Sequence, residues 1–174
     1  MNTSQRIAFS LCVSLFLCGF AAGADAKKAD WGIQIVPPKS ESVYGSTIRL
    51  REPFHVVLTN TSGKKLNVWR EWCSWGYYNL TFEIQLKDGK KYEITKRPAT
   101  WTRNGPDAYF VKKGAHFVYT IRFADDIWQG IPDNVQSHIV KIKALYKIEK
   151  DDETKEFNVW TGNVESEVIE VHLY

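Results

Sequence analysis

The chain has 174 residues, of which 23 are Lys or Arg and 20 are Asp or Glu, giving a formal net charge of +3. The basic residues occur singly or in scattered pairs such as Lys64-Lys65 and Lys112-Lys113. Proteins that bind nucleic acids gather Lys and Arg on one face or along one element. The sequence therefore argues against a nucleic-acid partner.

Residues 1–26 have the organisation of a secretory signal peptide. Arg6 precedes an apolar run over residues 7–23, and Ala24-Asp25-Ala26 supplies an Ala-x-Ala cleavage pattern. That run is shorter than the roughly 20 residues of a membrane-spanning helix, and no other apolar run approaches this length. We predict cleavage after Ala26, with Gly23 as the second choice, and export to the periplasm or the extracellular space. No membrane span is expected after cleavage.

Cleavage would leave Cys73 as the one cysteine of the mature chain, because Cys12 and Cys18 belong to the leader. A single thiol in an exported protein is buried, bridges two chains or is reactive. Cys73 lies between Trp72 and Trp75, and a cysteine among indoles behaves as a small buried hydrophobe. We predict that Cys73 is buried, with bridging and reactivity as the alternatives.

Apolar and polar residues alternate with a period of two along much of the mature chain, which is typical of strands with one buried face. The clearest such segments are residues 80–86, 117–123, 140–148 and 169–173; shorter candidates are 32–36, 53–59, 66–69, 91–96 and 156–160. Turn residues separate these segments. The pattern predicts an all-β fold for residues 27–174: a single antiparallel immunoglobulin-like sandwich of about 7–9 strands.

Several local features can be predicted from this alternation. The residues expected to share one core are Phe82, Ile84, Tyr119, Ile121, Ile142 and Ala144. The apolar residues on both sides of Asp88-Gly89 have even numbers. Residues opposed in an antiparallel pair point to the same face, so each apolar residue must pair with another even-numbered residue, and the two numbers must sum to an even number. A three-residue loop over residues 87–89 meets this condition, with Gly89 left-handed.

Two segments between the strands have weaker signals. Residues 125–130 are expected to form one helical turn, capped by Asp125 or Asp126. Residues 149–153 are expected to form a solvated hairpin tip.

Two stretches carry a family resemblance. Residues 53–70, which contain Asn60-Thr61-Ser62-Gly63 between two apolar runs, resemble the second and third strands of bacterial immunoglobulin-like domains. Residues 139–173 resemble the last strands of such domains, and a turn at Gly114 suits the same layout. The order is also similar to the bacterial intracellular proteinase inhibitor family. The resemblance implies a compact sandwich and, as an alternative function, inhibition of a proteinase through an exposed loop.

Residues 69–79 have the most unusual local composition, with three Trp, two Tyr and one Arg between two predicted strands. Two interpretations fit this segment. Trp, Tyr and Arg dominate binding hot spots, and their rings also stack on sugars. Alternatively, the indoles seal one end of the core. Arg70, Trp72, Trp75 and Tyr77 are the candidate partner-binding residues, and Trp101 and Trp128 could join the same patch.

Catalytic and metal-binding signals are weak. His55, His116, His138 and His172 show no metal-ligand spacing, and no Gly-x-Ser-x-Gly nucleophile motif occurs. His55 and His172 fall on polar phases of their strands, where solvated side chains are expected. We therefore predict a non-catalytic binding or structural module without a metal or cofactor, whose partner is another protein or a cell-envelope component. A metal-dependent hydrolase assembled from scattered His and Asp is the further alternative.

Overall fold

A computed structural model of the protein describes residues 29–39, 45–132, 135 and 138–174. The predicted leader and the predicted cleavage site lie outside these described residues. Within the described ranges, no helix has the length and apolar character needed to cross a membrane.

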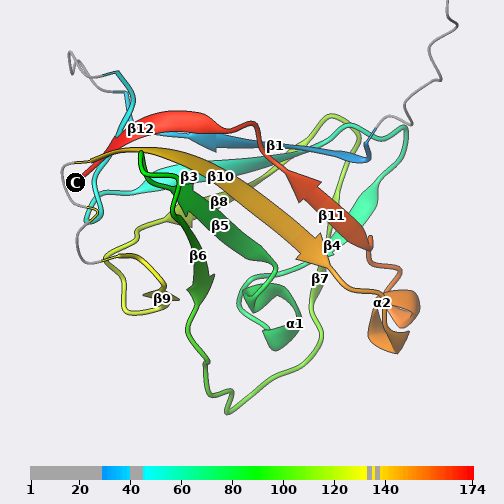
Figure 1. The fold of residues 1–174 in the computed structure, drawn as a ribbon. Helices are drawn as coiled ribbons and strands as arrows, with labels where there is room; N and C mark the ends of the chain where they lie inside the picture. The colour runs from blue at the N-terminus through cyan, green and yellow to red at the C-terminus, as the bar shows by residue number, and fades with distance from the viewer. Residues whose placement is uncertain (1–28, 40–44, 133–134, 136–137) are drawn as a thin grey trace, which may run out of the picture.

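Within the described residues the fold is all-β, with 12 strands in place of the expected 7–9, and two single-turn helices (Figure 1). The strands are β1 (Trp31–Val36), β2 (Thr47–Ile48), β3 (Phe54–Asn60), β4 (Leu66–Trp69), β5 (Leu80–Gln85), β6 (Lys91–Lys96), β7 (Ala108–Val111), β8 (His116–Ile121), β9 (Trp128–Gln129), β10 (His138–Ile148), β11 (Gly162–Glu165) and β12 (Ile169–Leu173). The helices are α1 (Ser74–Tyr77) and α2 (Asp152–Glu156), and both lie near the end of β10 (Figure 1).

The strands form three sheets. One has the order β1-β3-β8, a second pairs β4 with β7, and the largest has the order β2-β12-β10-β5-β6-β9, with β11 also paired to β10. The largest sheet is curled. The expectation of purely antiparallel pairing is wrong at one place, because β2 runs parallel to β12. Parallel neighbours require a long connection, and most of the domain lies between these two strands.

The period-two pattern identifies the core correctly. The inward-facing residues of β10 are buried from Val140 to Ile148, and so are all six residues predicted to share one core. Aromatic rings join the two larger sheets: Phe54 of β3 lies 5.8 Å from Phe82 of β5, and Tyr119 of β8 lies 6.0 Å from Tyr146 of β10. The predicted core residues thus form one continuous cluster.

The predicted hairpin between β5 and β6 is also confirmed. Ile84 pairs with Tyr92, and Phe82 with Ile94, so opposed positions sum to an even number. The backbone N–H of Leu86 donates to the carbonyl of Lys90, which leaves a three-residue loop. Gly89 has a φ of +87°, the left-handed conformation that the bulged loop requires.

The strand predicted over residues 156–160 is wrong, and helix α2 occupies the adjoining segment. Asp151 and Thr154 form a capping box: the Thr154 N–H donates to Asp151 Oδ1 at 2.7 Å, and the Asp151 N–H donates to Thr154 Oγ1 at 2.9 Å. Beyond the helix, the Trp160 N–H donates to the carbonyl of Asn67. The segment therefore docks on β4 and does not form the predicted strand.

The helical turn predicted over residues 125–130 is also wrong. The Trp128 N–H does donate to the Asp125 carbonyl, but the chain then enters β9, where Trp128 pairs with Lys96. Burial of the Trp128 indole in the core accounts for this choice, because it brings the segment against β6.

The two histidines that were expected to be solvated differ. His55 is exposed, as expected, but His172 is only 8% exposed, so the prediction of a solvated side chain is wrong there. The Tyr174 ring lies over His172 at 4.1 Å, and β2 runs alongside the same strand. Strand β2, which is distant in sequence, thus covers His172, although the local alternation predicts that His172 faces solvent.

Candidate functional site

The segment after β4 folds back tightly on itself. The Cys73 N–H donates to the Arg70 carbonyl, and α1 follows immediately. Gly76 lies so close to this turn that a Cβ atom there would be 2.0 Å from the Arg70 carbonyl oxygen. Only a glycine permits this approach without displacement of the backbone.

Cys73 is buried, as predicted, with 3% of its surface exposed. Its Sγ lies 3.1 Å from the Arg70 carbonyl oxygen, which can accept the weak thiol hydrogen bond. The neighbouring Trp72 side chain is exposed, so two indoles do not enclose the thiol; Cys73 belongs instead to the hydrophobic core cluster.

Arg70 stacks between two aromatic rings at the surface. Its guanidinium carbon lies 4.6 Å from the ring centre of Trp72 and 4.7 Å from that of Tyr109. Asp107 contacts both Arg70 and Trp72: its Oδ1 lies 3.3 Å from Arg70 Nε, and its Oδ2 accepts a hydrogen bond from Trp72 Nε1 at 3.0 Å. These contacts hold Trp72 in one orientation although 62% of it is exposed.

The stack continues along β7. The ring of Phe110 lies parallel to that of Tyr109 at 5.9 Å, and Lys65 Nζ lies 5.8 Å from the Phe110 ring centre. Phe110 is 52% exposed. We call Trp72, Arg70, Tyr109 and Phe110 the aromatic ladder.

The other two candidate residues lie elsewhere. Trp75 is partly buried and packs on Trp69, with 6.1 Å between ring centres. Tyr77 packs edge-on against Trp101 at 5.3 Å, and burial raises the pKa of Tyr77. The structure therefore divides the four candidates among three environments. Trp101 joins Tyr77, whereas Trp128 belongs to the core.

Lys96 is a buried cation that the sequence pattern did not single out. It lies on the inward-facing side of β6, with Nζ 4.5 Å from the ring centre of Tyr77 and 5.7 Å from that of Trp128. Its ion-pair partner, Glu71, is 3.8 Å away. Burial lowers the pKa of Lys96, and the charge of Glu71 opposes this effect in part.

A cleft of about 430 Å³ opens beside α1. Strand pairing places two rows of its residues on the outward face of the largest sheet: Thr81–Leu145–Glu165 and Asn79–Lys147–Asn163. Its remaining lining residues are Trp69, Trp75, Tyr78, Glu93, Tyr146, Ile148, Glu149, Asp151 and Val164.

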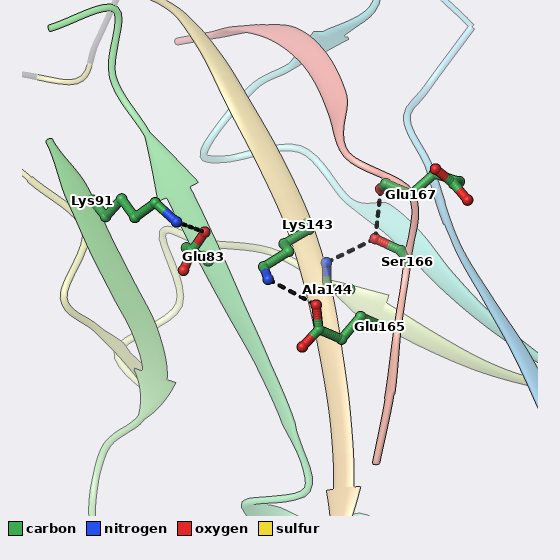
Figure 2. Close-up of polar contacts among 7 residues, drawn as sticks. All are labelled: Glu83, Lys91, Lys143, Ala144, Glu165, Ser166 and Glu167. Atoms are coloured by element: carbon green, nitrogen blue, oxygen red, sulfur yellow. Dashed lines mark hydrogen bonds and ion pairs between the residues drawn. The ribbon is translucent and has the colours of Figure 1, made fainter. Parts of the chain in front are cut away.

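Polar contacts organise the sheet face next to the cleft. Figure 2 shows Lys143 of β10 reaching Glu165 of β11 at 2.8 Å, and Lys91 of β6 reaching Glu83 of β5 at 3.0 Å. Ser166 extends the β11 contact by accepting the Ala144 N–H at 2.9 Å. The carboxylate at position 165 is therefore held in place at the edge of the cleft.

The cleft was not predicted, although the sequence contains one signal for it. Outward-facing positions of β10 carry Lys141, Lys143 and Lys147, and Leu145 interrupts this series with an apolar side chain. Leu145 is partly exposed and lies on the cleft floor. The apolar residue Leu145 at an otherwise polar position of the strand was thus the sequence signal for the cleft.

Within the ranges that the structure describes, no group of three or more His, Cys, Asp or Glu residues is arranged to hold a metal ion. His55 and His116 instead make cross-strand contacts with Thr120 at 3.3 Å and Thr59 at 2.9 Å. Comparisons of this chain with protein-family models, with curated proteins and with solved structures find no match.

Proposed function

We propose that this protein is an exported, non-catalytic binding domain of the immunoglobulin-like sandwich class, and that it recognises another protein at the cell envelope through the aromatic ladder. The observation that carries the proposal is the exposed Trp72 side chain, fixed by Asp107 and stacked on Arg70. A large exposed indole held in one orientation is unusual on a surface with no partner.

The residue types and the fixed side chains of the aromatic ladder support its role as a recognition surface. Trp, Tyr and Arg are the residues most often found at binding hot spots. Side chains that are already ordered lose little conformational entropy on association, which otherwise costs about 0.5–1.5 kcal/mol for each immobilised side chain. Phe110 extends the same surface with an exposed ring.

Site-specific photo-crosslinking in the source cell envelope tests the proposal. A photoreactive phenylalanine at position 110 should give a discrete adduct, and Trp72→Ala in the same chain should abolish it. A probe at Val168, which is equally exposed but outside the ladder, is the matched control. Equal adducts at both positions, or an adduct at position 110 that Trp72→Ala leaves unchanged, would contradict the proposal. Trp72→Ala should change the unfolding free energy by no more than about 1 kcal/mol, because the side chain is largely exposed.

Export is tested separately by the intact mass of the protein recovered outside the cytoplasm. The expected mass is that of a chain beginning at Lys27, because of the Ala-x-Ala pattern at residues 24–26. A recovered chain that retains residues 1–20 would contradict this.

A proteinase inhibitor is the second candidate, favoured by the loop over residues 97–107. Hydrogen bonds hold this loop: the Ala99 N–H donates to the Tyr78 hydroxyl at 3.1 Å, and Asn104 exchanges two hydrogen bonds with Ser74. Arg103 is exposed at its tip. Inhibition of trypsin that is lost in Arg103→Ala would establish this function. Full trypsin activity in the presence of excess protein would contradict the inhibitor function.

A further inference from the structure

We propose that the cleft beside α1 binds an organic cation carried on a hydrocarbon chain: the ammonium group of a polyamine or of a basic peptide side chain. This site is separate from the aromatic ladder and does not depend on it. It rests on three features of the cleft: its floor, its walls and its charge.

The floor provides an apolar surface for a hydrocarbon chain. Leu145 lies in the middle of the row Thr81–Leu145–Glu165, so an apolar side chain is flanked by a hydroxyl and a carboxylate on neighbouring strands. The volume of about 430 Å³ lies in the range of small-ligand sites, which is roughly 300–1,000 Å³.

The walls provide aromatic rings that are already fixed. Trp75 packs on Trp69, and the Tyr78 hydroxyl accepts the Ala99 N–H. Tyr78 lines the cleft and remains 44% exposed. Aromatic faces attract ammonium and guanidinium groups, by about 0.5–2 kcal/mol for each favourable contact.

The charge of the cleft is opposite to that of the whole chain. Its lining carries four carboxylates, those of Glu93, Glu149, Asp151 and Glu165, and one cation, Lys147. The chain as a whole carries +3, so this acidic excess is a local feature. Glu149 pairs with Lys147, and Glu165 pairs with Lys143, whose side chain lies beside the cleft. Glu93 lies opposite Glu83 on the neighbouring strand, and Glu83 itself pairs with Lys91 at 3.0 Å. Asp151 caps α2, and among the described residues Glu93 has no ion pair, so its carboxylate is the one left to meet a cation in the cleft.

A neutral saccharide is the competing ligand, because Asn79 and Asn163 provide amide groups beside the Trp75 and Tyr78 rings. A saccharide does not require the acidic excess. Replacing carboxylates by amides therefore separates the two ligand classes, since it removes charge and keeps hydrogen-bonding groups.

Isothermal titration calorimetry on the mature chain in physiological salt tests the proposal with two cationic probes: spermidine and a blocked dilysine peptide. We expect saturable binding of at least one of them, and the tighter probe identifies the source of the cation. Glu93→Gln and Glu165→Gln should each weaken binding about tenfold, which corresponds to about 1.4 kcal/mol. Glu170→Gln, on the exposed part of β12, is the matched control and should have no effect.

Leu145→Lys places a cation on the floor and should abolish binding of both probes. Because position 145 faces outward, this variant should fold, and the amide variants decide the question if it does not. Trp72→Ala should leave binding unchanged, so the test is independent of the aromatic ladder. The proposal is overturned if neither probe binds, if Glu170→Gln weakens binding as much as Glu165→Gln, or if diacetylchitobiose binds where both cations fail.

Discussion

Lys96 and Gly76 show how single residues shape the region around α1. Lys96 is a charged side chain on an inward-facing position, enclosed by Tyr77 and Trp128 and paired with Glu71. Gly76 lets the chain pass against the Arg70 carbonyl. Both residues connect the candidate sites to the core, and each has a measurable effect on stability.

Removing the charge of Lys96 should cost little, whereas removing its side chain should cost more. Lys96→Met keeps the hydrocarbon stem, so we expect a change within about 1 kcal/mol, since burying a charge is itself unfavourable. Lys96→Ala should cost about 2–4 kcal/mol through lost packing. Chemical denaturation of both variants measures the difference, and equal losses would contradict the assignment.

Lys96 also predicts a pH effect of definite sign. Burial lowers the pKa of Lys96 in the folded state below its ordinary value of 10.5. At a pH between the lowered pKa of the folded state and 10.5, Lys96 is protonated in the unfolded chain but not in the folded chain. Because the unfolded state then binds more protons, Lys96 makes the free energy of unfolding rise with pH. Denaturation midpoints up to pH 10 should therefore rise more in the wild type than in Lys96→Met.

Gly76→Ala should destabilise the fold by roughly 1–3 kcal/mol, because the added Cβ meets a backbone oxygen that cannot move without opening the turn. Gly63 is the matched control, since a Cβ there has no atom within 4 Å. Gly63→Ala should change stability by no more than about 0.5 kcal/mol. Equal effects in the two variants would show that the close approach at Gly76 is unimportant.

Strand β10 is the central element of the fold. It pairs with β5, β11 and β12, and its inward-facing residues from Val140 to Ile148 are buried. Its outward face carries the cleft floor at Leu145 and the ion pair of Lys143. One strand thus contributes to both the core and the proposed cation site.

Truncating a side chain on the buried face of β10 should lower the unfolding free energy strongly, whereas truncating an exposed strand residue should lower it little. Ile142→Ala should cost about 2–5 kcal/mol, from lost burial and the cavity that remains. Val118→Ala, at a half-exposed position on β8, should cost no more than about 0.5 kcal/mol. Urea titration compares them. Similar losses would mean that the burial pattern does not govern stability.

At the scale of the whole molecule, two buried tyrosines join the larger sheets. Tyr119 and Tyr146 are both buried and lie 6.0 Å apart. Burial raises the pKa of Tyr146 from 10.0 to about 12, and it raises that of Tyr119 as well. These groups resist ionisation in the folded state because the phenolate would lose its hydration.

The tyrosine shift predicts loss of stability in alkali. Below pH 10 the contribution of Tyr146 is fully present, and it is lost as pH rises from 10 towards 12, because the unfolded chain ionises first. A shift of this size corresponds to about 3 kcal/mol. Tyr146→Phe should flatten the decline in denaturation midpoint over this range. An unchanged slope would contradict the prediction.

The sequence was sufficient to predict features that depend on local pattern. The alternation in residues 140–148 identified the inward face of β10, and parity of position identified the loop at Gly89. Features that depend on distant contacts were not predictable. The course of residues 156–160 depends on docking to Asn67, burial of His172 depends on β2, and the cleft combines residues from several strands.

The strand order of the largest sheet has a consequence for self-association. Its paired path begins with β2 and ends with β9, and each of these strands is only two residues long. After β9, Gly130 has a φ of +88° and passes close to the Glu93 carbonyl of β6. A long unpaired edge would template the addition of another strand, whereas a two-residue edge offers too few free backbone groups to do so. The terminal strands β2 and β9 are therefore poor templates for edge-to-edge aggregation.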